Sequence, residues 1–216
     1  MIPPCIASKS TTLPSSKQIM INPFDLLIDS YLENNIGIDP GFLSEKLSAG
    51  LQQNILQLQR DDMLSIAGIG NDALQDHNQK MRGDKIYWMD KSHDNIHEQE
   101  FLQLIDNFIE RLNSTCYTGI NAYEFHYAVY EEGSFYKKHR DQFKNDSNRK
   151  YSLISYLNEN WLEEDGGQLM VYQDASTQKI SPRSQTAVFF KSDEMEHEVM
   201  QSNRARMSIS GWLKQV

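Results

Sequence analysis

The chain has 216 residues, 39% of them hydrophobic and 24% charged, which is enough for one domain with a buried core. Its formal net charge of -9 argues against general binding to duplex nucleic acid, because such binding needs a basic surface. No stretch approaches the roughly 18 consecutive apolar residues that a membrane-spanning helix needs, so we expect no membrane span.

The N-terminal segment has the composition of a loose leader. Residues 1–16 are rich in Ser, Thr and Pro and lack the basic start and apolar run of a secretory signal. We therefore expect a flexible leader over 1–21, a single domain over 22–216 and a cytoplasmic location. The two cysteines, Cys5 and Cys116, fit neither a disulfide framework nor a thiolate metal site, and free thiols suit that location.

The first part of the domain, 22–120, is expected to supply supporting helices and the first strands. Apolar residues recur with a helical period in Phe24–Leu32, in Pro40–Leu58 and in His97–Leu112. Lys85–Met89 has the composition of a short strand. Asp61–Gln79, with its glycines and polar residues, is expected to be irregular.

From Asn121 onward the sequence changes to short β-rich runs separated by polar turns. In the first run, apolar and aromatic residues alternate with others, which is the period of a strand with one buried face. The runs are Tyr123–Tyr130, Tyr151–Leu157, Gln168–Tyr172, Thr186–Phe190 and Arg206–Leu213. This spacing favours a sandwich or jelly roll, so the predicted class is α+β with a mainly β core over 121–216.

Two histidines and one carboxylate form a candidate metal site. His139 and Asp141 are two residues apart, so an extended chain points both side chains to the same side. His197 lies far along the sequence and can supply a third ligand. Two His and one carboxylate on one face of an octahedral ion leave three positions open, the arrangement of non-haem Fe(II) oxygenases. Taken singly, each histidine fits a surface or hydrogen-bonded core position equally well.

The remaining histidines are not expected to bind a metal. His93 and His97 are four residues apart and could share a helix face, but no Glu completes a zinc protease motif. His77 and His126 are expected to be structural or solvated.

A candidate anion site follows His197 by nine residues. On a strand, Arg206 and Ser210 share a face, so both can meet one carboxylate. The planar guanidinium of Arg suits this role, because it can donate two parallel hydrogen bonds to a carboxylate. The sequence thus offers metal ligands and, separately, an anchor for a dicarboxylate.

Basic residues are concentrated around His139. One interpretation is a solvated loop. The other is a positive rim that attracts an anionic cosubstrate or an acidic substrate. The residues are Lys137, Lys138, Arg140, Lys144, Arg149 and Lys150.

Three motifs together resemble the prolyl 4-hydroxylase type of Fe(II)- and 2-oxoglutarate-dependent oxygenase. Residues 130–141 read Y-x-x-G-x-x-Y-x-x-H-x-D, and residues 82–88 read R-G-D-K-I-Y-W. Tyr156-Leu157-Asn158 is followed by Trp161 and then by G-G-Q-L at 166–169. The second motif resembles the branch that contains the hypoxia-inducible-factor prolyl hydroxylases and their bacterial relatives. The resemblance covers roughly 81–213.

The resemblance implies a double-stranded β-helix and assigns the principal site residues. His139, Asp141 and His197 become the Fe(II) ligands, and Arg206 becomes the partner of the distal 2-oxoglutarate carboxylate. We take these four as the catalytic residues.

Further cofactor-binding positions follow from the same resemblance. Tyr156 and Ser210 match positions that hydrogen-bond the distal carboxylate, and Tyr130 matches one at the active-site mouth. Trp212 is expected in the same cofactor-binding set. For Tyr130, Tyr136 and Tyr156, ordinary packing within the barrel is the alternative.

The resemblance also implies an activity. The chain would bind Fe(II) and 2-oxoglutarate, with ascorbate as a candidate reductant, consume dioxygen, and release succinate and CO2. The expected substrate is a prolyl residue in a loop of a protein, hydroxylated at C4, with elongation factor Tu as the precedent for bacterial members. Hydroxylation of another protein side chain or of a free amino acid stays open. A non-catalytic metal-binding interaction module is the alternative from a different class.

One salt bridge is expected by analogy. In the resembling branch, the Asp of R-G-D-K pairs with an Arg seven residues before the Tyr that contacts 2-oxoglutarate. Here these positions are Asp84 and Arg149, counted back from Tyr156. We therefore expect Asp84 and Arg149 to form an ion pair.

Overall fold

The structure is a computed structural model that describes residues 22–67, 81–142, 147–174 and 176–216. The leader expected over 1–21 lies outside the described residues, as does 68–79, most of the segment expected to be irregular. Among the described helices, none has the length and apolar character needed to cross a membrane.

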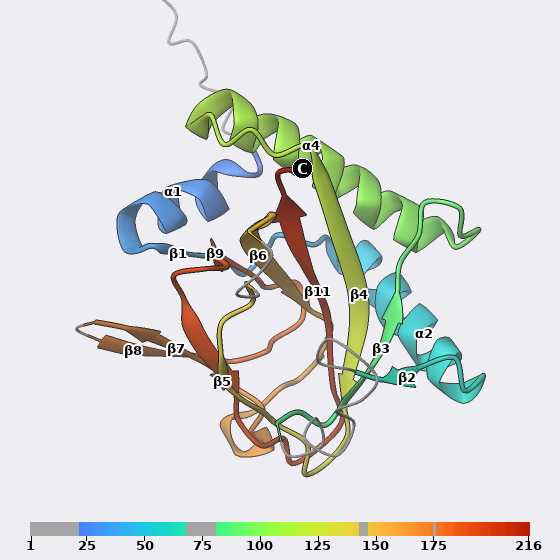
Figure 1. Ribbon diagram of the computed structural model, residues 1–216. Coiled ribbons are helices and arrows are strands. Elements are labelled where there is room, and N and C mark those ends of the chain that lie inside the picture. Colours follow the sequence, from blue (N-terminus) through green and yellow to red (C-terminus); the bar gives the residue numbers. More distant parts are fainter. Residues whose placement is uncertain (1–21, 68–80, 143–146, 175) are drawn as a thin grey trace, which may run out of the picture.

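Three helices lie on one face of the larger sheet (Figure 1). They are α1 (Asp25–Asn34), α2 (Glu45–Arg60) and α4 (Ile96–Cys116). The helix expected over Pro40–Leu58 begins only at Glu45, where the hydroxyl of Ser44 caps it by accepting from the Leu47 N–H. Asn95 caps α4 in the same way, so both helix starts are fixed by a side-chain oxygen.

Two antiparallel sheets form the β core. The larger sheet has the strand order β1-β9-β6-β11-β4-β3-β2, and the smaller has the order β5-β10-β7-β8. The larger sheet contains β1 (Ile36–Asp39), β2 (Ser65–Ile66), β3 (Asp84–Trp88), β4 (Ala122–Tyr130), β6 (Arg149–Tyr156), β9 (Ala187–Lys191) and β11 (Arg206–Lys214). The smaller contains β5 (Tyr136–His139), β7 (Leu169–Gln173), β8 (Ser176–Ile180) and β10 (Glu196–Val199). A 3-10 turn, Glu163–Asp165, precedes β7.

The predicted α+β jelly roll with supporting helices is confirmed, with local corrections. Every β-rich run expected after Asn121 forms a strand, within a few residues at each end. β1, β5, β8 and β10 were not expected, and β2 lies within the segment expected to be irregular.

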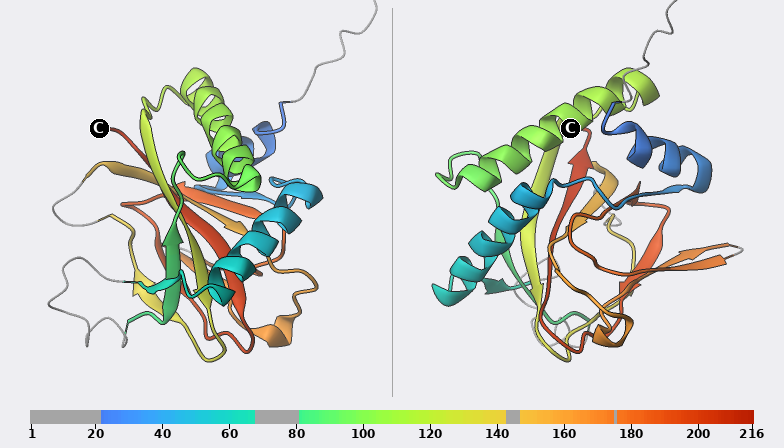
Figure 2. Two further views of the ribbon diagram at one scale, coloured as in Figure 1. Left: turned by 90° about the vertical axis from the view of Figure 1, so that its right-hand side faces the viewer. Right: turned by 180° about the vertical axis from the view of Figure 1, so that it is seen from behind.

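The larger sheet separates two apolar clusters, because successive residues of a strand point to opposite faces. On β9, Phe189 joins the cluster that packs against the helices, while Phe190 joins the cluster between the two sheets. The views in Figure 2 show the helices on one side of the larger sheet and the smaller sheet on the other. The space between the sheets therefore receives the inward residues of both.

Candidate active site

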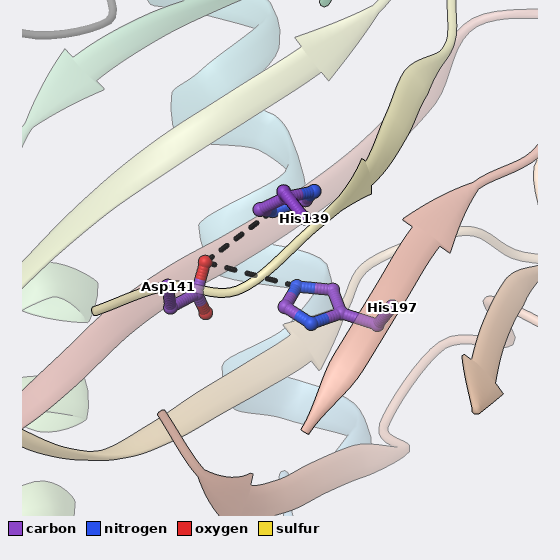
Figure 3. A group of neighbouring side chains, drawn as sticks. All are labelled: His139, Asp141 and His197. Carbon is purple, nitrogen blue, oxygen red and sulfur yellow. Dashed lines mark ion pairs between the residues drawn. The ribbon is translucent and has the colours of Figure 1, made fainter. Parts of the chain in front are cut away.

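The three predicted metal ligands meet between the sheets. His139 ends β5 and lies opposite His197 of β10 in the strand register, and Asp141 follows two residues later. Asp141 Oδ1 is 3.4 Å from His139 Nε2 and 3.7 Å from His197 Nε2. One ligand atom from each residue lies within 4.8 Å of the others. Figure 3 shows the Asp141 carboxylate turned toward both imidazole rings.

Each histidine is oriented by a backbone carbonyl. His139 Nδ1 lies 2.7 Å from the carbonyl oxygen of Lys137, and His197 Nδ1 lies 3.2 Å from that of Met195. A carbonyl can only accept, so both Nδ1 atoms carry the proton and both Nε2 atoms keep a free lone pair. This is how proteins orient metal-binding imidazoles, and the donor set fits Fe(II).

A serine hydroxyl fixes the second carboxylate oxygen of Asp141. Ser152 donates to Asp141 Oδ2 at 2.6 Å, and its oxygen is 2.9 Å from that of the buried Ser192. Burial by itself raises the pKa of Asp141, but the neighbouring histidines and the Ser152 hydroxyl hold that pKa well below its usual range. Asp141 is therefore ionised and turns Oδ1 to the metal position.

Arg206 supplies a buried positive charge at the start of β11. Its side chain is 1% exposed and lies 4.9 Å and 5.0 Å from the ring centres of Tyr130 and Tyr156. Its Nε donates to the Gly167 carbonyl at 2.8 Å, but it forms no ion pair with any Asp or Glu of the described residues. A buried charge without a counterion is costly, so this position is suited to an anionic ligand.

Tyr156 adds an unused polar atom beside this charge. Its hydroxyl is buried and has no hydrogen-bond partner in the described part of the chain. Burial raises the pKa of Tyr156, although the charge of Arg206 opposes the shift. The neutral hydroxyl can therefore donate to the same anion that Arg206 would bind.

Most of the predicted site residues line one cavity of about 130 Å³. It connects the metal ligands to Arg206, a geometry suited to a short dicarboxylate held at both ends. Tyr156 packs against Arg206 without lining the cavity. The predicted residues that line it are His139, Asp141, His197, Arg206, Tyr130, Ser210 and Trp212, with Tyr136.

Several residues at or beside the site were not predicted from the sequence. Ser208 lies on the same face of β11 as Arg206, and its oxygen is 3.4 Å from a guanidinium nitrogen. Ser208 shares the face of β11 with Arg206 as Ser210 does, and it is closer to Arg206 along the strand. Ser152 had no motif to mark it. His126, expected to be structural or solvated, lines the cavity with Trp88.

The predicted ion pair between Asp84 and Arg149 is wrong. Asp84 pairs with Arg82, whose Nε is 2.6 Å from its carboxylate, and Arg149 pairs with Glu124 at 2.7 Å. The register explains the error, because Asp84 lies opposite Tyr130 at one end of β4 and Arg149 lies beside its other end.

The basic stretch around His139 is partly neutralised. Lys138 and Arg140 both approach Glu196, at 2.9 Å and 3.9 Å, so they do not form an uncompensated positive rim. Lys144 lies outside the described residues. His93 pairs with Glu98 on α4, and no metal-binding group other than the triad occurs among the described residues.

The chain is similar to known oxygenases. Residues 125–214 match the model of the 2OG-Fe(II) oxygenase superfamily. A prolyl-4-hydroxylase from Pseudomonas putida is similar with a TM-score of 0.81 and 28% identity, over 89% of this chain and 99% of that one. A prolyl hydroxylase from Trichoplax adhaerens, in complex with a hypoxia-inducible-factor peptide fragment, is similar with a TM-score of 0.78 and 26% identity, over 88% of each chain.

A more distant similarity concerns the fold alone. The viral collagen prolyl hydroxylase from Paramecium bursaria Chlorella virus-1 has a TM-score of 0.58 and 20% identity, over 84% of this chain and 97% of that one. Together with the family match, these similarities confirm the resemblance and the jelly-roll fold stated from the motifs.

Proposed function

We propose that this chain, which is a 2-oxoglutarate-dependent dioxygenase, hydroxylates a prolyl residue of a protein at C4. The observation that carries the proposal is the single cavity between the sheets. It joins a His-Asp-His cluster to a buried arginine that has no counterion among the described residues. The structures from Pseudomonas putida and Trichoplax adhaerens, at 28% and 26% identity, are both of prolyl hydroxylases, which supports the choice of substrate.

The residues present would hold both cofactors. His139, Asp141 and His197 would bind Fe(II) through Nε2, Oδ1 and Nε2. When bound, Fe(II) with 2-oxoglutarate and dioxygen supplies the oxidant that replaces a substrate C–H bond by C–OH, with succinate and CO2 as products. The protein's contribution is to hold these groups in place and to exclude water.

The far end of the cavity would bind the distal carboxylate of 2-oxoglutarate. Arg206 would donate hydrogen bonds to it, and the unpartnered Tyr156 hydroxyl would donate another. Ser208 contacts Arg206, so it can share this carboxylate; Ser210, Tyr130 and Trp212 line the cavity, and their contact with the cosubstrate stays a prediction.

The proposed substrate is a proline in a flexible loop of a cytoplasmic protein. The fixed φ of proline makes a loop present C4 in a narrow range of directions, which favours positioning of C4 beside the metal site. If the source is bacterial, elongation factor Tu is the first candidate. Ascorbate is the candidate reductant.

The test is product analysis on intact protein substrates. The full chain is incubated with Fe(II), 2-oxoglutarate, ascorbate and elongation factor Tu, succinate is quantified, and added oxygen is mapped by tandem mass spectrometry. We expect one added oxygen on proline, with a matching amount of succinate. Oxygen on a different side chain, or on a free amino acid supplied instead, would replace the prolyl assignment. No succinate under any of these conditions would favour a non-catalytic metal-binding module.

A further inference from the structure

His126 lies in the wall of the cavity, and its Nδ1 has no hydrogen-bond partner among the described residues. It lies on β4, is 3% exposed, and lines the same cavity as the metal ligands. Its ring lies 4.8 Å from that of Trp88 and 5.4 Å from that of Trp212, with both distances measured between ring centres. The two indole ring centres are 6.3 Å apart, so the three rings form one cluster that restricts the orientation of the imidazole.

Two buried side-chain nitrogens at this point have no partner among the described residues. They are Nδ1 of His126 and Nε1 of Trp212. Burial, reinforced by the charge of Arg82, lowers the pKa of His126 to about 4, so the neutral ring carries one N–H. Buried donors left unpaired are costly, which indicates that a ligand supplies acceptors here.

The position of His126 separates it from the Arg206 end of the cavity. In the strand register, Arg206 lies opposite Tyr130, whereas Ser210 lies opposite His126 four residues away on β4. Four residues of a strand span about 13 Å. Trp88, which is paired with His126 across β3 and β4, is 46% exposed, so this end of the cavity faces the solvent from which a protein substrate would approach.

A prolyl residue matches this pair of donors. Within a chain, proline has no backbone N–H and offers only a carbonyl oxygen for polar recognition. A wall that binds proline must therefore donate hydrogen bonds, and it has no use for an acceptor. The Trp212 indole can only donate, and the neutral His126 can donate from one nitrogen.

We propose that the His126 imidazole donates a hydrogen bond to the backbone carbonyl oxygen of the target proline, with Trp212 Nε1 as the adjacent donor. His126 is then a specificity-determining residue that distinguishes a prolyl residue within a chain from a pyrrolidine ring alone. This inference rests on the proposed prolyl substrate.

The test compares two small probes on the full chain loaded with Fe(II) and 2-oxoglutarate without oxygen. N-acetyl-L-prolinamide has the carbonyl that follows the proline ring, and N-acetylpyrrolidine lacks it. Dissociation constants are read from the change that each probe makes in the visible absorption of the loaded enzyme. We expect the wild type to prefer N-acetyl-L-prolinamide about tenfold, the effect of one buried hydrogen bond.

Three variants assign the preference to His126. His126→Phe keeps the stacked ring without a nitrogen and should reduce the preference to about onefold. His126→Gln keeps an N–H donor and should retain part of it. His93→Gln, at a histidine whose ring lies 5.5 Å from that of Tyr87 and which pairs with Glu98 on α4, is the matched control and should retain all of the preference.

The outcomes separate this inference from the proposed function. Equal affinity of both probes for the wild type, or a preference that survives in His126→Phe, would overturn the role of His126 and leave the prolyl substrate in place. A weaker 2-oxoglutarate affinity in His126→Phe with unchanged probe preference would also overturn it. Failure of both probes to bind the wild type would overturn the prolyl substrate and the inference together.

Discussion

Adjacent residues of β9 illustrate the difference between the two faces of the larger sheet. Phe189 packs against Tyr31 and Phe108 on the helix side, with ring centres 5.1 Å and 5.4 Å apart. Phe190 faces the other way and lies 4.8 Å from the ring of His197. On one face aromatic rings pack against one another, and on the other an aromatic ring packs against a histidine of the candidate metal site.

The two faces of the larger sheet differ in what their side chains contribute to stability and to ligand binding. On the helix face, side chains meet their native partners and contribute to the free energy of folding. On the cavity face, Arg206, His126 and Tyr156 are buried with their polar atoms only partly satisfied. Such groups cost stability until a ligand binds, so the cavity face should be the ligand-dependent part of the molecule.

The largest effect is expected from removing a metal ligand. His139→Ala and His197→Ala should each abolish Fe(II)-dependent succinate formation while leaving the helix-facing core intact. Succinate assays with limiting iron measure the first effect, and far-ultraviolet circular dichroism measures the second. Turnover like that of the wild type in either variant would show that these residues do not form the metal site.

The two phenylalanines of β9 provide a matched pair. Phe189→Ala and Phe190→Ala should each lower the free energy of unfolding by about 3–5 kcal/mol, since both remove a buried ring. Only Phe190→Ala should also weaken iron binding, because only its ring contacts a metal ligand. Urea titration and iron titration of both variants test this. Equal loss of iron affinity in both would show that the two faces are not separable.

Replacing Arg206 tests the anion site. Arg206→Ala should weaken 2-oxoglutarate binding by about 2–5 kcal/mol, because the variant leaves the distal carboxylate without its charged partner. Iron affinity should change little. The matched control is Arg204→Ala, whose side chain lies at the surface near Asp165. An unchanged 2-oxoglutarate titration in Arg206→Ala would mean that another cation binds the acid.

The buried His126 should make the protein sensitive to acid. Its folded pKa of about 4 lies below its unfolded value, so the unfolded chain binds the extra proton first as pH falls. Its contribution to stability is present above about pH 6.5 and is lost as the pH falls toward 4. Between pH 7 and pH 5 the loss from this group is about 2 kcal/mol. Urea unfolding at pH 7 and pH 5 should show a smaller loss of unfolding free energy in His126→Gln than in the wild type. An equal loss in the two proteins would show that His126 does not cause the acid sensitivity.

The smallest effect concerns the serine that orients Asp141. Ser152→Ala removes the hydroxyl that donates to Oδ2 and should weaken iron binding about tenfold. Ser155→Ala, three residues along the same strand, removes a buried hydroxyl that has no partner in the described residues and should leave iron affinity unchanged. Equal iron affinity in the two variants would show that Ser152 does not position the ligand.

The same two faces explain what could be predicted from the sequence. β4 and β11 of the larger sheet were recognisable because their helix-facing residues keep the apolar alternation, whereas β1 and β2 of the same sheet were not predicted. β5 and β10 were missed because His139 and His197, the candidate metal ligands, occupy inward positions at which an apolar residue would mark a strand. These strands therefore lack the alternation of apolar residues by which a strand is usually recognised.

The site residues also differ in whether they could be predicted from the sequence. The metal ligands and Arg206 were predicted because their chemistry restricts both residue type and spacing. Ser152 and His126 were not, because a buried serine or histidine has no spacing that distinguishes a positioning role from ordinary packing. The pairing of Asp84 failed because it depends on strand register, which the motif does not encode.

The most direct test of the account is a crystal structure of the full chain grown without oxygen in the presence of Fe(II) and 2-oxoglutarate. We expect one metal ion coordinated by His139 Nε2, Asp141 Oδ1 and His197 Nε2. We also expect 2-oxoglutarate on that ion, with its distal carboxylate paired with Arg206 and hydrogen-bonded by Tyr156. A metal ion bound elsewhere, or a distal carboxylate paired with another cation while Arg206 stays without a partner, would contradict it.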